Sequence, residues 1–282
     1  MKQNPPYLYS LIGLLCLAPM TLTDTHAEEK TQPAAEQSSP KGPWGFNLSS
    51  YLWTAGLKGD FTAGGHSGSV DASFIDIWGK SRRPPLGFMG RLEIHYERFA
   101  FYMDGNYMNI QLKPALGRIS EGIGSEIGLM DYGLMYRIFG APASELANQE
   151  GRKRSNVLDV YAGARTFWMG NSVTFSGPFG LAQRSPTTGR SFTSPVIGGR
   201  FGVDFTPNLF VLADVNFGGF GADNVDFTGG LMGMLGYRTH LFGVPTSVEA
   251  GYRAIRYNVD PHGPAAANAT LNGPFIGLTG YW

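Results

Sequence analysis

Ionisable side chains alternate with apolar ones over residues 87–97, and this is the clearest pattern in the chain that could support chemistry. The ionisable residues of this segment are Arg91, Glu93, His95 and Glu97. Successive side chains of a β-strand point to opposite faces, so this spacing gathers the four groups on one face of a strand. A face of this kind can hold ion pairs, exchange protons or line a path for charged solutes.

The same alternation continues in later segments and assigns more charged residues to that face. They are Asp104, Asp131, Arg137, Asp159, Arg165, Arg200, Asp204, Asp214, Arg238, Glu249 and Arg253. Together with the first group they make six arginines and eight carboxylates that face one another. An unpaired charge in a poorly hydrated interior is costly, so we expect these groups to pair. The pairs either close the interior as an interlocked core or line a gated path for ions or solutes.

Four of these arginines follow a glycine by two positions. The four motifs are Gly163-Ala164-Arg165, Gly198-Gly199-Arg200, Gly236-Tyr237-Arg238 and Gly251-Tyr252-Arg253. A spacing of two puts each glycine on the same strand face as its arginine. We expect each glycine to leave room for the guanidinium to lie flat in a narrow interior.

Ten segments carry the strand pattern, with turn-like or polar segments between them. Their bounds are Phe46–Leu57, Gly87–Glu97, Phe99–Leu112, Glu126–Phe139, Val157–Phe175, Ser194–Phe205, Leu209–Phe220, Val225–Phe242, Ser247–Val259 and Leu271–Trp282. Apolar residues on one face and charged residues on the other suit a barrel with lipid outside and a polar lumen inside. The sequence therefore predicts an all-β fold, a single antiparallel up-and-down transmembrane β-barrel of ten strands, with eight or twelve strands as the alternatives.

The last segment is expected to close the barrel by pairing with the first strand, because an unpaired strand would leave a sticky edge. Its terminal Trp282 resembles the C-terminal signal that the barrel-assembly machinery reads in outer-membrane barrels, which implies this machinery as a partner. If both termini are periplasmic, the short turns fall on the same side, as is the rule for such barrels. These turns lie at Arg98, Thr206–Asn208 and Gly243–Thr246, whereas the longer Gly140–Asn156 is the exception.

The loop after the first strand is long, and its part Ser69–Trp78 alternates again. This pattern predicts either a hairpin or a piece that tucks into the barrel mouth. A hairpin inside the membrane would raise the strand count to twelve.

Two groupings place a histidine near a serine or an aspartate in the expected outer loops. They are His66 with Ser67 and Asp71, and Asp260 with His262. A surface hydrolase needs such a pair, so that a base can activate water or a hydroxyl. Neither grouping stands in a known hydrolase motif, so we expect no catalytic residues. The sequence also has no metal-ligand spacing and no nucleotide-binding fingerprint, and we expect no metal and no cofactor.

The composition argues against several other classes of protein. Lysine plus arginine and aspartate plus glutamate number 22 each, so the net charge is zero and we expect no nucleic-acid partner. The single cysteine, Cys16, lies in a segment expected to be removed. We therefore expect neither a disulfide nor cysteine catalysis in the mature protein.

The N-terminal segment has the features of an export signal. Residues 1–27 combine Lys2, an apolar stretch and the small-residue site Thr25-His26-Ala27, which predicts a cleaved signal peptide. Residues 28–43 are polar and predict a disordered periplasmic leader. The barrel domain then spans residues 44–282, and its expected location is the outer membrane, with outer-membrane lipids including lipopolysaccharide around it.

Several stretches of the chain resemble an uncharacterised family of Gram-negative outer-membrane β-barrel proteins. They are YLWTAGLKGDF (51–61), VDASFIDIW (70–78), FYMDGNYMNI (101–110), LDVYAGAR (158–165), PVIGGRFG (195–202) and the ending GPFIGLTGYW. The resemblance implies fold and location but no activity and no site residues. We therefore expect an integral outer-membrane protein of structural or surface-interaction type with a charge-paired lumen. The first alternative is a narrow channel for small solutes, and the second is a surface hydrolase.

Overall fold

The computed structural model describes residues 42–63, 66–73, 87–112, 120–142, 153–176, 182–184, 188–260 and 266–282. All of them belong to the compact unit Pro40–Trp282. The predicted signal peptide and all but the last two residues of the predicted leader lie outside the described residues. Within the described ranges, no helix is long and apolar enough to cross a membrane.

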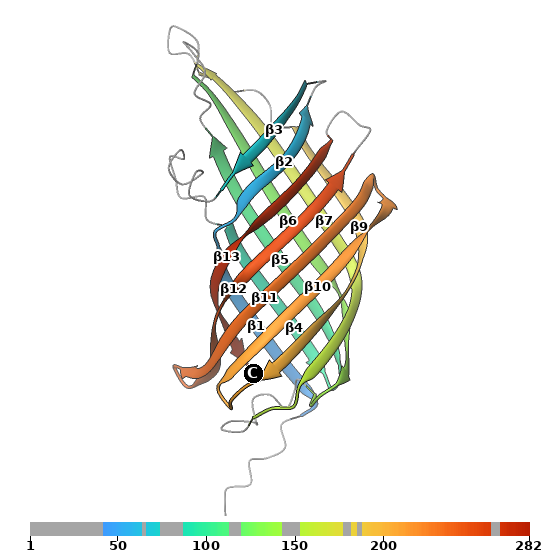
Figure 1. The fold of residues 1–282 in the computed structure, drawn as a ribbon, viewed down its shortest axis with the longest axis vertical. Helices are drawn as coiled ribbons and strands as arrows, with labels where there is room; N and C mark the ends of the chain where they lie inside the picture. The colour runs from blue at the N-terminus through green and yellow to red at the C-terminus, as the bar shows by residue number, and fades with distance from the viewer. Residues whose placement is uncertain are drawn as a thin grey trace, which may run out of the picture. The chain divides into compact units, whose positions relative to one another are not determined.

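Every regular element of the described chain is a β-strand (Figure 1). The strands are β1 (Trp44–Trp53), β2 (Gly56–Ala63), β3 (His66–Ala72), β4 (Gly87–Tyr96), β5 (Phe99–Leu112), β6 (Ser120–Phe139), β7 (Val157–Ser176), β8 (Ala182–Arg184), β9 (Thr188–Asp204), β10 (Leu209–Ala222), β11 (Val225–Leu241), β12 (Val244–Val259) and β13 (Ala267–Tyr281). Several run further than the sequence pattern predicts: β6 begins six residues before Glu126, and β9 begins six residues before Ser194.

Ten of these strands form a closed barrel, which confirms the predicted fold class. The wall runs in the order β1, β4, β5, β6, β7, β9, β10, β11, β12 and β13, and all neighbours are antiparallel. β13 pairs with β1 from Asn47↔Tyr281 to Trp53↔Phe275, so the last strand closes on the first as expected. Closure leaves no free edge in this part of the sheet.

The hairpin β2–β3 extends the sheet at the far end of β13. The first predicted strand is interrupted after Trp53, and β2 then continues along β13 with Leu57 opposite Leu271. β3 folds back on β2, with Asp60 opposite Ser69. Residues 69–72 of the alternating piece Ser69–Trp78 thus form part of one arm of this hairpin, and residues 74–78 lie outside the described ranges. β8 is a short addition that pairs with the end of β7.

Three turns lie beside the chain end, at what is here called the C-terminal end of the barrel: Glu97-Arg98, Phe205–Asn208 and Phe242-Gly243. The first two agree with the predicted turns, whereas β12 already begins at Val244, inside the predicted turn Gly243–Thr246. The two-residue turn Asp223-Asn224 joins β10 to β11 at the opposite end, so short turns are not confined to one end of the barrel. Phe46 and Trp282 exchange backbone hydrogen bonds of 2.9 Å in both directions, and this pairing holds the C-terminus beside β1. The turn between β4 and β5 is Glu97-Arg98, with Glu97 at φ 50°. Glu97 is exposed in this turn, so its assignment to the inner face was wrong. The alternation ends at Tyr96 because the chain reverses direction there.

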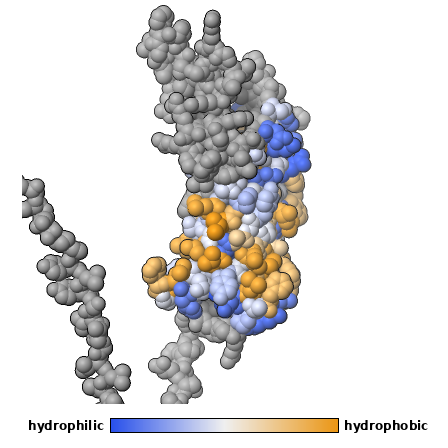
Figure 2. Space-filling model, turned by 60° about the vertical axis from the view of Figure 1, so that its left-hand side comes forward, coloured by the Kyte–Doolittle hydropathy of each residue, from blue (hydrophilic) through white to orange (hydrophobic). Residues whose placement is uncertain are grey.

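The outer face of the barrel is apolar. Leu134, Phe99 and Leu231 are 67%, 61% and 58% exposed although they belong to regular strands. Figure 2 shows apolar side chains gathered over the outer surface. Aromatic pairs lie at the C-terminal end of the barrel, where the rings of Trp44 and Tyr96 are 4.9 Å apart. An exposed apolar surface of this extent, bordered by aromatic rings, is what a lipid-facing barrel wall requires.

Candidate functional site in the barrel lumen

The charged residues predicted for the inner face lie inside the barrel, apart from Glu97. Those that are buried are Glu93, His95, Asp104, Asp131, Arg137, Asp159, Arg165, Arg200, Asp204, Asp214, Glu249 and Arg253. Arg91 and Arg238 are partly buried, with side chains 12% and 16% exposed. The inner face is thus a polar core made of six arginines, seven carboxylates and one histidine.

Some of these groups pair along the barrel wall. Asp131 and Arg165 are directly opposite on β6 and β7, and both guanidinium donors reach the carboxylate at 2.6 Å. Arg137 makes a similar two-bond pair with Asp159, at 2.7 and 3.0 Å. The strand register alone brings these partners together, because directly opposite side chains lie within reach of one another.

Other pairs cross the lumen between strands that are not neighbours. Arg200 on β9 donates to Glu93 on β4 at 2.5 Å. Arg253 on β12 donates to Asp104 on β5 at 3.2 Å. Arg165, already bound to Asp131, also donates to Thr228 on β11 at 2.8 Å. These contacts join opposite walls of the barrel, so the arginine side chains occupy its centre.

Glu93 is the most heavily shared carboxylate. It accepts from Arg91 at 2.6 Å and from Arg200, and it contacts the ring of His95 at 3.0 Å. Asn47 on β1 donates to it at 3.3 Å. His95 therefore belongs to the lumen network.

Two buried carboxylates differ from the others because they make no ion pair with a described residue. Asp214 accepts from the Tyr161 hydroxyl at 2.6 Å and from Asn216 at 3.3 Å. Glu249 accepts from Tyr51, Ser247 and Thr279. The sequence pattern identified both residues as inward-facing, but it did not predict that hydroxyls would be their partners.

A layer of apolar side chains lies on the inner face beyond the charged residues, on the side away from the C-terminal end of the barrel. It is formed by Trp53, Met89, Met108, Ile127, Leu129, Phe167, Ile255, Tyr257, Leu271 and Phe275, all less than 5% exposed. The rings of Phe167 on β7 and Tyr257 on β12 are 5.3 Å apart, so this layer also spans the lumen. The sequence analysis missed it. The signal was present, because apolar residues occupy the inward positions before the charged residues in β4 and β6 and after them in β7 and β12.

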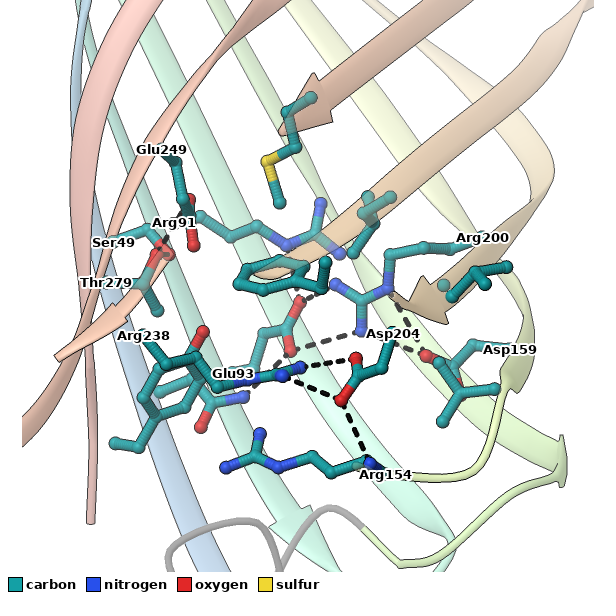
Figure 3. A pocket seen from close by; sticks show the side chains of 18 of the residues that line it. Ser49, Arg91, Glu93, Arg154, Asp159, Arg200, Asp204, Arg238, Glu249 and Thr279 are labelled. Carbon is teal, nitrogen blue, oxygen red and sulfur yellow. Dashed lines mark hydrogen bonds and ion pairs between the residues drawn. The ribbon is translucent and has the colours of Figure 1, made fainter. Parts of the chain in front are cut away.

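Two of the cavities among the described residues lie between the charged side chains. The larger has a volume of about 110 Å³, and its walls include Arg91, Glu93, Arg200, Asp204, Arg238 and Glu249 (Figure 3). The smaller measures about 20 Å³ and lies between Arg91, Tyr102 and Asp214. The lumen thus holds partly open spaces, bordered by charged side chains, between its ion pairs.

The glycines of the Gly-X-Arg motifs have a different role from the predicted one. A Cβ at Gly198 would lie 2.4 Å from the ring of Tyr161, and one at Gly236 would lie 2.2 Å from the ring of Phe210. A Cβ at Gly163 would meet the carbonyl of Tyr132. These glycines make room for aromatic rings and for the neighbouring backbone rather than for their own arginines.

The candidate catalytic groupings find no support. His66 and Asp71 occupy opposite parts of β3, five residues or roughly 17 Å apart along the strand. Asp71 binds Lys58 at 2.7 Å, and Asp260 binds Arg190 at 2.8 Å. His262 lies outside the described residues. Among the described residues, no group of three or more His, Cys, Asp or Glu side chains is placed to hold a metal ion.

Comparisons with known proteins find distant likenesses among solved structures. No family model and no curated protein matches the chain. Similar solved structures include the outer membrane protease OmpT of Escherichia coli, with 11% identity, 85% of this chain and 97% of that chain covered, and a TM-score of 0.44. The attachment invasion locus protein Ail of Yersinia pestis has 11% identity, 86% and 99% coverage and a TM-score of 0.36. Neisserial surface protein A has 13% identity, 83% and 96% coverage and a TM-score of 0.27.

These neighbours are outer-membrane β-barrel proteins of Gram-negative bacteria, and their low scores add nothing about activity. The chain's own features are a closed antiparallel wall and an apolar outer face of the lipid-facing type. The chain is a ten-stranded β-barrel of the outer-membrane type.

Proposed function

We propose that this protein is a non-enzymatic outer-membrane barrel of structural or surface-interaction type, with a lumen that does not conduct. The observation that carries the proposal is the cross-lumen ion pair between Arg200 and Glu93, together with the apolar layer beyond it. A barrel of eight strands is narrow enough for side chains to fill its interior, and ten strands widen it only slightly. Pairs that join opposite walls use up this small space.

The charge pairing also supports a structural role for the lumen residues. Arginines that each hold one or two carboxylates tie strands from different parts of the sequence together. An open water-filled pore would leave such groups free to bind solutes instead. A barrel with this interior presents its loops and the hairpin β2–β3 to the outside, so a partner would meet the protein there. Outer-membrane lipids including lipopolysaccharide, and the barrel-assembly machinery acting on β13, complete the proposed set of partners.

Solute flux tests the proposal. Residues 28–282 would be refolded and reconstituted into liposomes, with a general porin in parallel as the positive control. We expect small sugars to enter the liposomes at the rate of protein-free vesicles. Uptake at a porin-like rate would overturn the closed lumen and establish the alternative, a narrow channel for small solutes.

A further inference from the structure

Glu249 is a buried carboxylate with no cationic partner among the described residues. Its exposed fraction is 1%, and its oxygens accept from Ser247 at 2.5 Å, Tyr51 at 2.7 Å and Thr279 at 3.1 Å. All three donors are neutral hydroxyls. A buried charge is costly unless a charge of opposite sign compensates it, so a cation or a proton would stabilise this carboxylate.

A suitable cation, Arg238, lies next to Glu249 in the sheet but is engaged elsewhere. Glu249 is opposite Gly236, and Arg238 is the next inward residue on the same strand. Such diagonal neighbours are about 7–8 Å apart. Arg238 directs two donors at Asp204, both at 2.7 Å, and its guanidinium carbon lies 4.4 Å from the centre of the Phe210 ring. The carboxylate of Glu249 and the guanidinium of Arg238 therefore lie close together without pairing with each other.

Both groups lie in the wall of the larger cavity. Glu249, Arg238, Ser49 and Thr279 all contribute to its wall, and Figure 3 shows them around it. A cavity of about 150 Å³ accepts benzene, so 110 Å³ has room for about four or five non-hydrogen atoms. The cavity is thus large enough for a small molecule and has wall groups of both signs.

Two glycines beside Glu249 leave room for the aromatic rings that pack next to the cavity. The residues directly opposite Glu249 are Gly236 on one neighbouring strand and Gly277 on the other. A Cβ at these positions would lie 2.2 Å from the Phe210 ring and 2.1 Å from the Tyr51 ring. Their absent side chains let both rings pack beside Glu249, which itself belongs to the wall of the cavity.

We propose that this cavity binds a small zwitterion of the amino-acid type. Its ammonium group donates to Glu249 and to the hydroxyl oxygens of Ser49 and Thr279, while its carboxylate accepts from the Nε–H of Arg238, the donor that Asp204 leaves free. A simple anion would lie against Glu249, and a simple cation would lie against the arginines of the same wall. A molecule with both charges on neighbouring atoms satisfies both sides of the cavity at once.

Asp214, the other carboxylate without an ion pair, does not share this arrangement. It borders the separate space of about 20 Å³, whose wall also includes Arg91. That volume suits a single water molecule, which can donate to a carboxylate and accept from a guanidinium. Asp214 therefore provides a matched control for Glu249.

Calorimetric titration of the refolded protein in detergent tests the proposal with three probes: glycine, methylammonium and acetate. We expect glycine to bind at least tenfold more tightly than either of the other two. Glu249→Gln should weaken glycine binding at least tenfold, whereas Asp214→Asn should leave it unchanged, although both variants remove one negative charge. Leu212→Phe fills the cavity from its wall and should abolish binding, which covers the case in which Glu249→Gln does not fold.

The other outcomes overturn the proposal. Acetate binding equal to that of glycine, insensitive to Glu249→Gln, would make the cavity an anion site. Methylammonium binding equal to that of glycine would make it a cation site. An absence of heat with all three probes would mean that the cavity holds only water. Glycine binding and solute flux are measured separately, so this inference can fail while the closed lumen stands.

Discussion

Arg200 on β9 and Glu93 on β4 form an ion pair across the barrel lumen, with Nη1 and Oε1 2.5 Å apart. Three strands, β5, β6 and β7, lie between them on the shorter side of the wall. Arg200 also holds Asp159 at 3.1 Å, and Glu93 also holds Arg91. The pair therefore connects the charge networks of two opposite walls, and its removal should affect the barrel as a whole.

Arg200→Ala should lower the free energy of unfolding by about 3–5 kcal/mol, because it leaves two buried carboxylates with one donor fewer. Urea unfolding of the detergent-refolded protein measures the change. Lys58→Ala is the control, since Lys58 and Asp71 pair at 2.7 Å with both side chains 72% exposed. An exposed pair of this kind contributes less than about 1 kcal/mol. Equal effects of the two substitutions would show that Arg200 does not hold the lumen together.

Glu249→Gln and Asp159→Asn should change stability in opposite directions, although each removes one buried negative charge. Asp159 accepts from Arg137 and Arg200, so its neutralisation should destabilise the barrel by about 3 kcal/mol. Glu249 has only hydroxyl donors among the described residues, so its neutralisation should stabilise the ligand-free barrel by about 1 kcal/mol. Unfolding midpoints in the same detergent compare them. A loss of stability in Glu249→Gln as large as that in Asp159→Asn would contradict the assignment of Glu249 as an uncompensated charge.

Gly198→Ala should destabilise the barrel by about 1–3 kcal/mol, because its new methyl group would meet the Tyr161 ring 2.4 Å away. Tyr161 would have to move, and its 2.6 Å hydrogen bond to Asp214 would be disturbed. Gly233→Ala is the matched control, since a Cβ there has no atom within 4 Å. The account of these glycines fails if thermal unfolding shifts equally in both variants.

Leu134→Arg should impair folding into bilayers, because Leu134 is 67% exposed on the outer face of β6. An arginine facing the lipid near the middle of the membrane costs about 2–4 kcal/mol. Phe242→Arg places the same charge in the turn between β11 and β12, at the C-terminal end of the barrel. There the cost should be about 0–1 kcal/mol. Folding yields into lipid vesicles, read from heat-modifiable gel mobility, should separate the two variants. Similar yields would argue against a lipid-facing position for Leu134.

The strands that form the wall of the barrel could be predicted from the sequence, because strand alternation depends on neighbouring residues alone. Arg91 and Glu93 alternate with apolar residues, and this fixes which side of the wall each faces. Ten strands, their closure through β13 and the inward position of nearly every charged residue follow from such local patterns. Glu97 was misassigned because the same alternation cannot show where a strand ends and a turn begins.

The ion pairs across the lumen could not be predicted from the sequence. Asp131 and Arg165 meet through strand register, but Arg200 reaches Glu93 only because ten strands close with a particular tilt and stagger. The same limit explains the missed apolar layer, since Phe167 and Tyr257 meet from strands that do not adjoin. Local pattern also cannot show that Gly198 makes room for Tyr161 on the neighbouring strand.

Single-channel recording in planar bilayers tests the central claim, a lumen closed by charge pairs and an apolar layer, most directly. The refolded protein would first be shown to have a heat-modifiable band, so that a silent bilayer reports on a folded barrel. We predict no unitary current steps from the wild-type protein at either polarity. Steady unitary steps would contradict the closed lumen and would make Arg200 and Arg253 candidates for setting the selectivity of a channel.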